Sequence, residues 1–298
     1  MSIITNGWLN VYKPIDITSS KTVLTIKKKF NLKKVGHAGT IDPLAEGILP
    51  IAIGNTTKII SFIENKSKKY EFIIKWGEQT TTDDSEGDLM FSSDCIPNEN
   101  EINQILPNYL GIIDQVPPKY SAVKVNGVRA YKLSRKQVKF DLKSKSVKVF
   151  SLKFKKNTNF NESLFTITCG KGFYIRSFAR DLALSLGTRG HIIKLKRQEV
   201  GIFNEKNSIL LDDLLKIRHL SSSINGYFHS TVVLDDIPAL TVDDSEISEI
   251  RMGKKIEISF LEQNKLKFRK DIYAKKNNEI IAFGYIENNF FKPKKVFN

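Results

Sequence analysis

Residues 35–54 read VGHAGTIDPLAEGILPIAIG, a glycine-rich irregular loop followed by an apolar run that is typical of a buried strand. Within the loop, Asp42 precedes Pro43, which disfavours helix for Asp42 and holds its carboxylate on a stiff turn. The glycines permit close approach of a ligand to the backbone. On composition alone, however, an aspartate in such a loop is most often a turn residue, and catalysis is the minority interpretation.

Patterns on both sides of this loop predict an α+β protein. Alternating or continuous apolar runs predict strands at 7–13, 48–54, 70–76, 146–155 and 162–169. Capping residues and helical spacing predict helices from Thr18 to about Lys34 and at 98–110, 174–186 and 209–220. After a polar linker, SSSINGYFHS, closely spaced β-like runs, among them 255–260 and 271–274, predict a small β-rich module.

Positive charge is concentrated in two segments. The 298 residues carry 47 basic and 32 acidic side chains, a net charge of +15, which points to nucleic acid or an anionic membrane as partner. Segment 119–148 holds ten basic residues and one acid, and segment 21–34 holds six lysines and no acid. Solvated lysine faces are the alternative interpretation. Aromatic side chains among the lysines of 119–148 favour RNA, and this segment lacks the apolar face that membrane binding needs.

Several function classes lack sequence support. Two cysteines, Cys95 and Cys169, suit a reducing cytosol and are too few for a disulfide scaffold. The four histidines are widely spaced, and neither a Walker A motif nor a GxGxxG loop occurs. We therefore expect no metal and no nucleotide or redox cofactor. Because the sequence also lacks a signal peptide and an apolar run of membrane-spanning length, we expect a cytoplasmic protein.

Seven blocks of this sequence resemble, in the same order, motifs of the TruB family of tRNA pseudouridine synthases. The opening loop is similar to GHxGTLDPxAxGxL, with Ile41 in place of leucine. The other blocks are LNVYKPIDITSS (9–20), KKYEF (68–72), TTTDDSEG (80–87), QVPPKYSAVKVNG (115–127), CGKGFYIRSFARDL (169–182) and LKRQEVGIF (195–203). Near the C-terminus, IAFGYI and KPKKVF resemble the PUA-like module that ends many bacterial members.

The resemblance implies an isomerase that converts the T-loop uridine at tRNA position 55 to pseudouridine by base flipping. It implies a pseudouridine-synthase catalytic domain over 1–231 with a central mixed, mainly antiparallel sheet. It also implies a basic RNA-gripping insertion at about 119–148 and a PUA-like RNA-binding domain over 232–298. The expected partner is the T-arm stem-loop of tRNA; we expect no membrane, no obligate protein partner and a monomer.

The resemblance assigns the chemistry to three residues. Asp42 is similar to the family's catalytic aspartate, whose carboxylate acts as a nucleophile or stabilises charge while the glycosidic bond breaks. Arg176 is similar to the arginine that pairs with this aspartate, and Tyr70 to the tyrosine that stacks on the target uracil. Without the resemblance, Arg176 is interpreted as a structural ion-pair residue and Tyr70 as a core aromatic.

Further residues are assigned to substrate binding by the same resemblance. His37 is expected to enter the RNA loop and fill the space that the flipped base leaves. Tyr174 is expected to place a hydroxyl near the carboxylate, Leu195 to form an apolar wall over the base, and Lys13 to support the loop. The basic insertion contributes Lys119, Tyr120, Lys124, Arg129 and Lys132.

Two departures and two rival functions stay open at this point. Asp16 stands where the family usually has glycine, and Phe173 stands where threonine is usual. If position 16 has a positive φ, aspartate tolerates it less well than glycine does. The first rival is a tRNA-binding folding chaperone, which would not need Asp42 and Arg176. The second is an enzyme that modifies another RNA with the help of a guide RNA.

Overall fold

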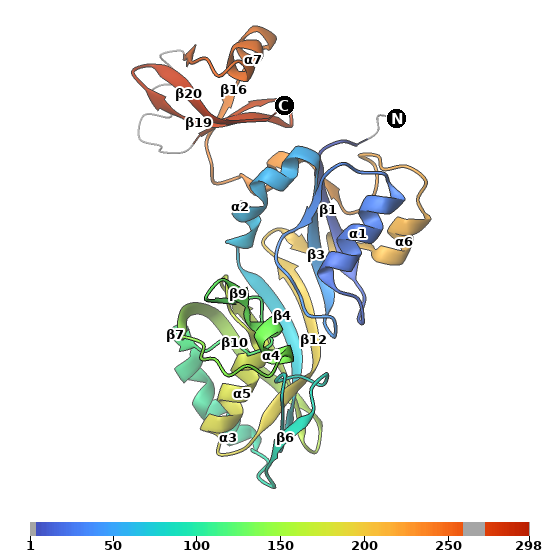
Figure 1. Ribbon diagram of the computed structural model, residues 1–298, viewed down its shortest axis with the longest axis vertical. Helices are drawn as coiled ribbons and strands as arrows, with labels where there is room; N and C mark the ends of the chain where they lie inside the picture. Colours follow the sequence, from blue (N-terminus) through green and yellow to red (C-terminus); the bar gives the residue numbers. More distant parts are fainter. Residues whose placement is uncertain (1–3, 259–271, 298) are drawn as a thin grey trace.

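The computed structural model describes residues 4–258 and 272–297, which form two β-sheets with helices packed against them (Figure 1). The larger sheet has eleven strands in the described residues, with the central order β14-β1-β3-β12-β4-β11-β10-β7. Its strands are β1 (Gly7–Lys13), β2 (Val35–His37), β3 (Glu46–Ile53), β4 (Lys68–Trp76), β7 (Gly111–Gln115), β10 (Lys145–Asn159), β11 (Glu162–Cys169), β12 (Gly190–Val200), β13 (Phe203–Asn204), β14 (Ile209–Leu210) and β15 (Tyr227–Phe228).

Among the described strand pairings of this larger sheet, only β1 with β14 and β3 with β12 are parallel. The sheet is therefore mixed and mainly antiparallel, and the predicted α+β class is confirmed. The helices are α1 (Ser19–Lys29), α2 (Ile60–Glu64), α3 (Glu99–Ile105), α4 (Ala130–Arg135), α5 (Ile175–Ser185), α6 (Leu211–Lys216) and α7 (Asp244–Arg251). Two small hairpins pair β5 (Glu78–Thr80) with β6 (Leu89–Ser92) and β8 (Lys124–Val125) with β9 (Val128–Arg129).

Local signals explain where the helices end, and two of the predicted lengths were wrong. Helix α1 begins as predicted, because the Thr18 side chain accepts a hydrogen bond from the Lys21 backbone. It ends at Lys29 and not near Lys34, since Asn31 has a left-handed backbone with φ of 48°. The predicted helix at 209–220 shrinks to α6, because 209–210 instead form a strand beside β1.

Helices cover the large sheet in two places. Aromatic rings of α5 and the sheet pack together: Phe178 lies 5.8 Å from Phe72, and Phe72 stacks on Phe165 at 5.5 Å between ring centroids. At the other end, Val23 and Ile26 of α1 pack with α6 over β1 and β3. These two cores fix the ends of the strands that surround the glycine-rich loop.

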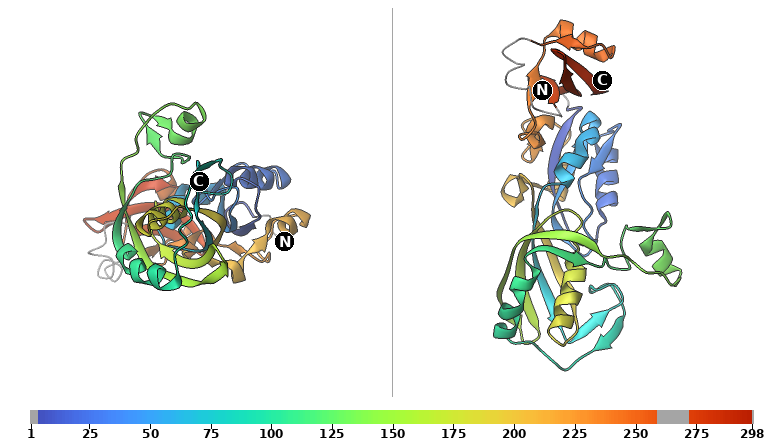
Figure 2. Two further views of the ribbon diagram at one scale, coloured as in Figure 1. Left: turned by 90° about the horizontal axis from the view of Figure 1, so that it is seen from below. Right: turned by 90° about the vertical axis from the view of Figure 1, so that its left-hand side faces the viewer.

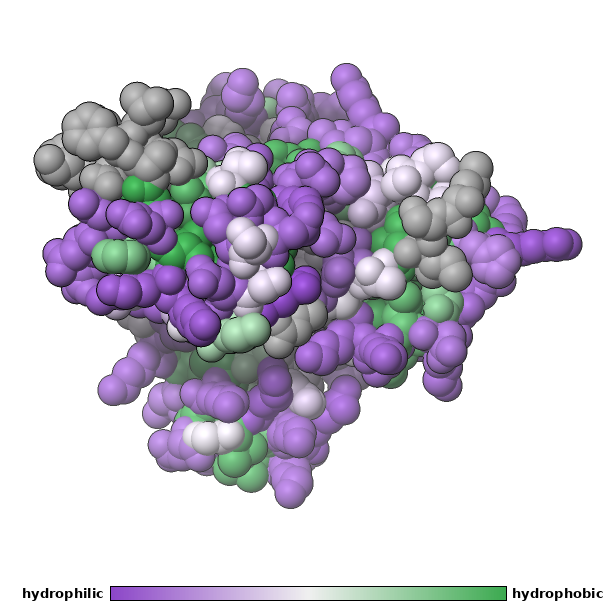
Figure 3. All heavy atoms as spheres, turned by 90° about the horizontal axis from the view of Figure 1, so that it is seen from above, coloured by the Kyte–Doolittle hydropathy of each residue, from purple (hydrophilic) through white to green (hydrophobic). Residues whose placement is uncertain are grey.

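The second sheet belongs to the C-terminal module and has the order β16-β18-β19-β20-β17. Its strands are β16 (Ala239–Thr241), β17 (Ile256–Glu257), β18 (Ile272–Lys276), β19 (Glu279–Glu287) and β20 (Phe290–Val296). The predicted runs at 255–260 and 271–274 extend beyond the described residues. This module shares an apolar core with the large sheet, and Phe62 stacks on Phe283 at 5.2 Å. The face seen in Figure 3 is covered mainly by hydrophilic side chains, with apolar ones in small separate areas.

Candidate active site

The Asp42 loop runs between β2 and β3 and is held by the N-terminal part of the chain. The hydroxyl of Ser19 donates to the Ile41 carbonyl and accepts from the Ile41 amide, each at 3.0 Å. The amide of Asp16 donates to the Pro43 carbonyl at 2.9 Å. Asp16 has a φ of 61°, so this position does require the left-handed backbone for which glycine is usual. The sequence predicted a loop from residue 35, but 35–37 pair with β3 as strand β2.

Lys13 supports the same loop from inside the protein. Its side chain is completely buried, and its ammonium donates to the carbonyls of Pro14 and Ile17 at 2.8 Å and of Pro43 at 3.3 Å. Burial lowers the pKa of Lys13 to about 8. Because it is enclosed in this way, Lys13 reaches the loop backbone and not the surface; its assignment to substrate binding stays a prediction.

Asp42 and Arg176 form a two-pronged ion pair. The Nε atom of Arg176 lies 2.9 Å from Oδ2 of Asp42, and Nη2 donates to Oδ1 at 3.1 Å. The Asp42 side chain is 31% exposed, whereas that of Arg176 is only 6% exposed. The carboxylate is therefore oriented from behind while part of it stays accessible to a substrate.

Arg176 is itself held by groups that the sequence analysis did not assign. Its Nη1 atom lies 3.3 Å from Asp84 and donates to the Thr82 carbonyl at 3.0 Å, and Nη2 donates to the Tyr120 carbonyl at 3.1 Å. Burial raises the pKa of Asp84, and the charge of Arg176 opposes that rise. The signal was present in the TTTDDSEG block, but the pattern alone does not tell which of its acids points inward.

Aromatic and apolar side chains lie next to this ion pair. Tyr70 on β4 and Leu195 on β12 belong to one buried cluster with Ile41 of the loop. Burial raises the pKa of Tyr70 to about 12, with a smaller contribution from the Asp42 charge. Burial also raises the pKa of Tyr174. The three predicted residues are thus brought together around Asp42, and both tyrosine hydroxyls stay protonated near neutral pH.

His37 lies at the end of β2, opposite Ile51 of β3. It is half-buried, and its Nδ1 atom is enclosed without a hydrogen-bond partner in the described residues. Burial, followed by the positive charge of Arg197, lowers the pKa of His37. The ring is therefore neutral near pH 7, which suits stacking better than acid–base work.

The basic insertion stands out from the body of the molecule around α4 (Figure 2). It is joined to the ion pair through the backbone carbonyl of Tyr120, which accepts a hydrogen bond from Nη2 of Arg176. The four cationic side chains that the resemblance assigns to RNA binding are exposed and make no ion pair with the described residues; they are Lys119, Lys124, Arg129 and Lys132. Lys124 and Arg129 face each other across the β8–β9 hairpin.

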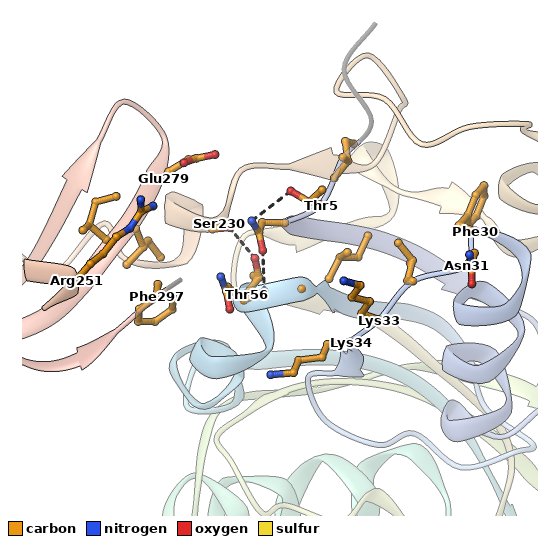
Figure 4. A pocket seen from close by; sticks show the side chains of 18 residues that line it. Thr5, Phe30, Asn31, Lys33, Lys34, Thr56, Ser230, Arg251, Glu279 and Phe297 are labelled. Carbon is orange, nitrogen blue, oxygen red and sulfur yellow. Dashed lines mark hydrogen bonds between the residues drawn. The ribbon is translucent and has the colours of Figure 1, made fainter. Parts of the chain in front are cut away.

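A cavity of about 650 Å³ lies elsewhere, where the large sheet meets the C-terminal module (Figure 4). Lys33 and Lys34 line one side and Arg251 and Phe297 the other. None of the site residues predicted from the sequence is among the described residues that line it. Within the described residues, no group of three or more His, Cys, Asp or Glu side chains could hold a metal ion, and no helix is long and apolar enough to cross a membrane.

Comparison with solved structures defines the class of fold. A chain in the crystal structure of a Cbf5–Nop10–Gar1 complex matches with a TM-score of 0.71 and 23% identity, covering 99% of this chain and 85% of that one. A chain of an H/ACA RNP bound to a substrate RNA containing 2′-deoxyuridine matches with a TM-score of 0.70 and 20% identity, covering 98% and 85%. The chain therefore shares its fold with these two solved structures.

Family models and curated relatives identify the family. The model of the TruB family pseudouridylate synthase N-terminal domain matches residues 27–175, and that of the tRNA pseudouridylate synthase B C-terminal domain matches 176–232. A tRNA pseudouridine synthase B from Ehrlichia ruminantium is 44% identical, covering 98% of this chain and 99% of the relative. The protein of that name from Caulobacter vibrioides is 38% identical, covering 98% and 96%. The chain belongs to the TruB family of pseudouridylate synthases.

Proposed function

We propose that this chain converts uridine 55 in the T-loop of tRNA to pseudouridine, with Asp42 as the catalytic carboxylate. The observation that carries this assignment is the partly exposed carboxylate clamped by the buried guanidinium of Arg176. An isomerase of this kind only moves the glycosidic bond from one atom of uracil to another. Its site therefore needs a charged group for that step, a side chain on which the flipped base stacks, and cationic residues that bind the RNA. Relatives up to 44% identical along 98% of the chain carry the name tRNA pseudouridine synthase B.

The geometry supports the following roles. The flipped uracil stacks on Tyr70 with Leu195 as the apolar wall, and unstacking costs a few kcal/mol. As the N1–C1′ bond breaks, the uracil leaves as an anion, and Asp42 attacks the electron-poor sugar carbon or stabilises its charge. The base then turns and its C5 atom bonds to C1′; where Asp42 has bonded to C1′, that bond breaks and the carboxylate is released. The C5 proton leaves to solvent or a nearby base, and N1 takes up a proton. Arg176 holds the carboxylate in its orientation throughout.

RNA binding is assigned to surfaces around this centre. The exposed cations of the insertion contact phosphates, and the neutral ring of His37 fills the space that the base leaves. We assign 1–231 to a catalytic domain and 232–298 to a PUA-like RNA-binding domain. The two parts share an apolar core, so truncation after 231 would expose Trp8 and Ile59. We further propose that the protein acts in the cytoplasm, as a monomer and without a protein partner.

Tritium release tests the proposal directly. A tRNA transcript that carries uridine labelled with tritium at C5 loses the label when the glycosidic bond moves to C5. Wild type should release the tritium from position 55, and Asp42→Asn should bind the tRNA without releasing it. Binding without release by wild type would instead support the tRNA chaperone.

The guide-RNA-dependent rival is separated by the substrate. The test substrate is an isolated T-arm stem-loop, which contains the target loop, and it is first assayed with no other RNA present. Release from this stem-loop by the protein alone supports the T-loop enzyme, whereas release only after addition of another RNA supports the guided enzyme.

A further inference from the structure

Arg197 lies in the middle of the large sheet, directly behind the Asp42 loop. On β12 it pairs with Gly47 of β3 on one side and with Tyr70 of β4 on the other. Its side chain is among the largest in the described part of the chain that are fully buried. Arg197 thus stands between the strand that leaves the catalytic loop and the strand that carries the base-stacking tyrosine.

The guanidinium of Arg197 joins the two ends of the Asp42 loop. Nε donates to the Ile48 carbonyl at 2.7 Å, beyond the loop, and Nη2 donates to the Gly39 carbonyl at 3.0 Å, before Asp42. Nη1 lies 3.5 Å from the Thr40 carbonyl. The positive charge of Arg197 also acts on the Tyr70 hydroxyl and opposes the rise in its pKa that burial causes. One planar group therefore fixes three backbone positions relative to each other.

The loop also packs against the backbone of Arg197. Gly47 has a φ of 110°, and a Cβ atom there would lie 2.3 Å from the Arg197 carbonyl oxygen. Gly39 has a φ of 87°, and a Cβ atom there would lie 3.6 Å from Nη1. Two glycines of the loop thus allow it to approach β12 closely, because neither backbone conformation suits other residues.

The charge environment of Arg197 differs from that of Arg176. Arg176 has two carboxylates within ion-pair distance, whereas the side chain of Arg197 has only carbonyls as hydrogen-bond partners among the described residues. Burying a cation without a carboxylate partner costs free energy. An apolar side chain would occupy the same position in the sheet at a lower free-energy cost. Among the carboxylates, the charge of Asp42 itself acts on Arg197.

We propose that Arg197 is a positioning residue for the isomerisation: it anchors the Asp42 loop to β12 and fixes its spacing from Tyr70. The proposal rests on the proposed function of Asp42 and Tyr70. Displacing a reacting group by about 1 Å can lower a rate about 100-fold. Loss of the anchor should therefore act on the chemical step and leave RNA affinity unchanged.

Two variants of Arg197 and one matched control test this role. Arg197→Met removes the hydrogen bonds, and Arg197→Lys keeps the positive charge but offers a single donor nitrogen. Lys68→Met is the control, because Lys68 is also a buried cation on the same sheet. It is 7% exposed and donates to the carbonyls of Glu64 and Lys66, which lie outside the Asp42 loop. Each variant is assayed for single-turnover tritium release, for tRNA dissociation constant and for amide hydrogen exchange of 38–48 in the free protein.

Arg197→Met should lower the single-turnover rate about 100-fold or more, with an unchanged dissociation constant and faster exchange over 38–48. Arg197→Lys should fold and remain at least about tenfold slower than wild type, so it decides the question if the methionine variant does not fold. Lys68→Met should change neither the rate nor the exchange of 38–48. An unchanged rate in a folded Arg197 variant, or an equal rate loss in Lys68→Met, would overturn the proposal.

The outcome for Arg197 can be separated from the outcome for the proposed function. If wild type releases no tritium, the proposed function fails, but the exchange measurement still reports whether Arg197 anchors the loop. Faster exchange over 38–48 in Arg197→Met alone supports the anchor, and equal exchange in wild type and both Arg197 variants contradicts it.

Discussion

The catalytic centre and the basic insertion are built in opposite ways. Around Asp42 the charged groups are buried and paired, as the 6% exposed Arg176 side chain with its two carboxylates illustrates. In the insertion the cations are exposed, and short elements such as β8, β9 and α4 carry them away from the body of the molecule (Figure 2). Buried and fixed charges suit work on a transition state, and exposed flexible ones suit contacts with a phosphate backbone.

The largest effect is expected from removing the positive charge of Arg176, which pairs with Asp42 in the catalytic centre. Arg176→Met leaves Asp84 buried without its partner, so the free energy of unfolding should fall by about 3–5 kcal/mol. The single-turnover rate should fall by about 1,000-fold, as with the loss of a preorganised charge partner. Denaturant unfolding and tritium release measure the two effects.

The matched control lies on the same helix. Arg180→Met also breaks ion pairs, with Asp83 at 3.0 Å and Asp181 at 2.9 Å, but none with Asp42. It should lower stability and leave the rate near that of wild type. Equal rate losses in Arg176→Met and Arg180→Met would show that any ion pair on α5 affects the rate equally. That result would contradict a specific role for the ion pair with Asp42.

Removing cations from the insertion should act on binding alone. In the triple variant Lys124→Gln, Arg129→Gln and Lys132→Gln, the salt dependence of tRNA binding should weaken by about one unit per lost phosphate contact. The rate at saturating tRNA should not change. A control that removes three exposed lysines of β10, at positions 153, 155 and 156, changes the net charge equally. Equal losses of affinity in both triple variants would contradict a localised grip.

Features that depend on local motifs could be predicted from the sequence, whereas contacts between residues far apart in the sequence could not. The pairing of Asp42 with Arg176 was implied by the resemblance of two local motifs to the TruB family, and the strand at 48–54 followed from its apolar run; the structure contains both. Arg197 and Asp84 were not singled out, because their burial results from strands that lie far apart in the sequence. A lysine- and arginine-containing strand such as β12 does not reveal which cation points inward.

A smaller effect is expected at the contact that joins helix α1 to the loop. Ser19→Ala removes both hydrogen bonds to Ile41 and leaves a buried amide and carbonyl unpaired. Stability should fall by about 1–3 kcal/mol, and the single-turnover rate should fall with it. Thr18→Ala removes only the helix cap and should cost about 1 kcal/mol without a rate effect. A wild-type rate in Ser19→Ala would contradict a role for this contact in positioning the Asp42 loop.

The smallest effect concerns stability against pH. Burial lowers the pKa of Lys68 to about 8, below its ordinary value of 10.5. Between these two values the unfolded chain binds more protons at this site, so its contribution to stability rises with pH. The stability of wild type relative to Lys68→Met should therefore increase from pH 8 to pH 10. Parallel profiles, measured by urea unfolding at each pH, would contradict the lowered pKa.

The most direct test compares Asp42→Asn with the triple insertion variant on one labelled tRNA. Single-turnover tritium release and the tRNA dissociation constant are measured for both at two salt concentrations. The account predicts that Asp42→Asn loses release and keeps wild-type affinity and salt dependence. It predicts that the triple variant keeps the saturated rate and loses affinity. Substantial release by Asp42→Asn at saturating tRNA would contradict the central claim that this carboxylate performs the chemistry.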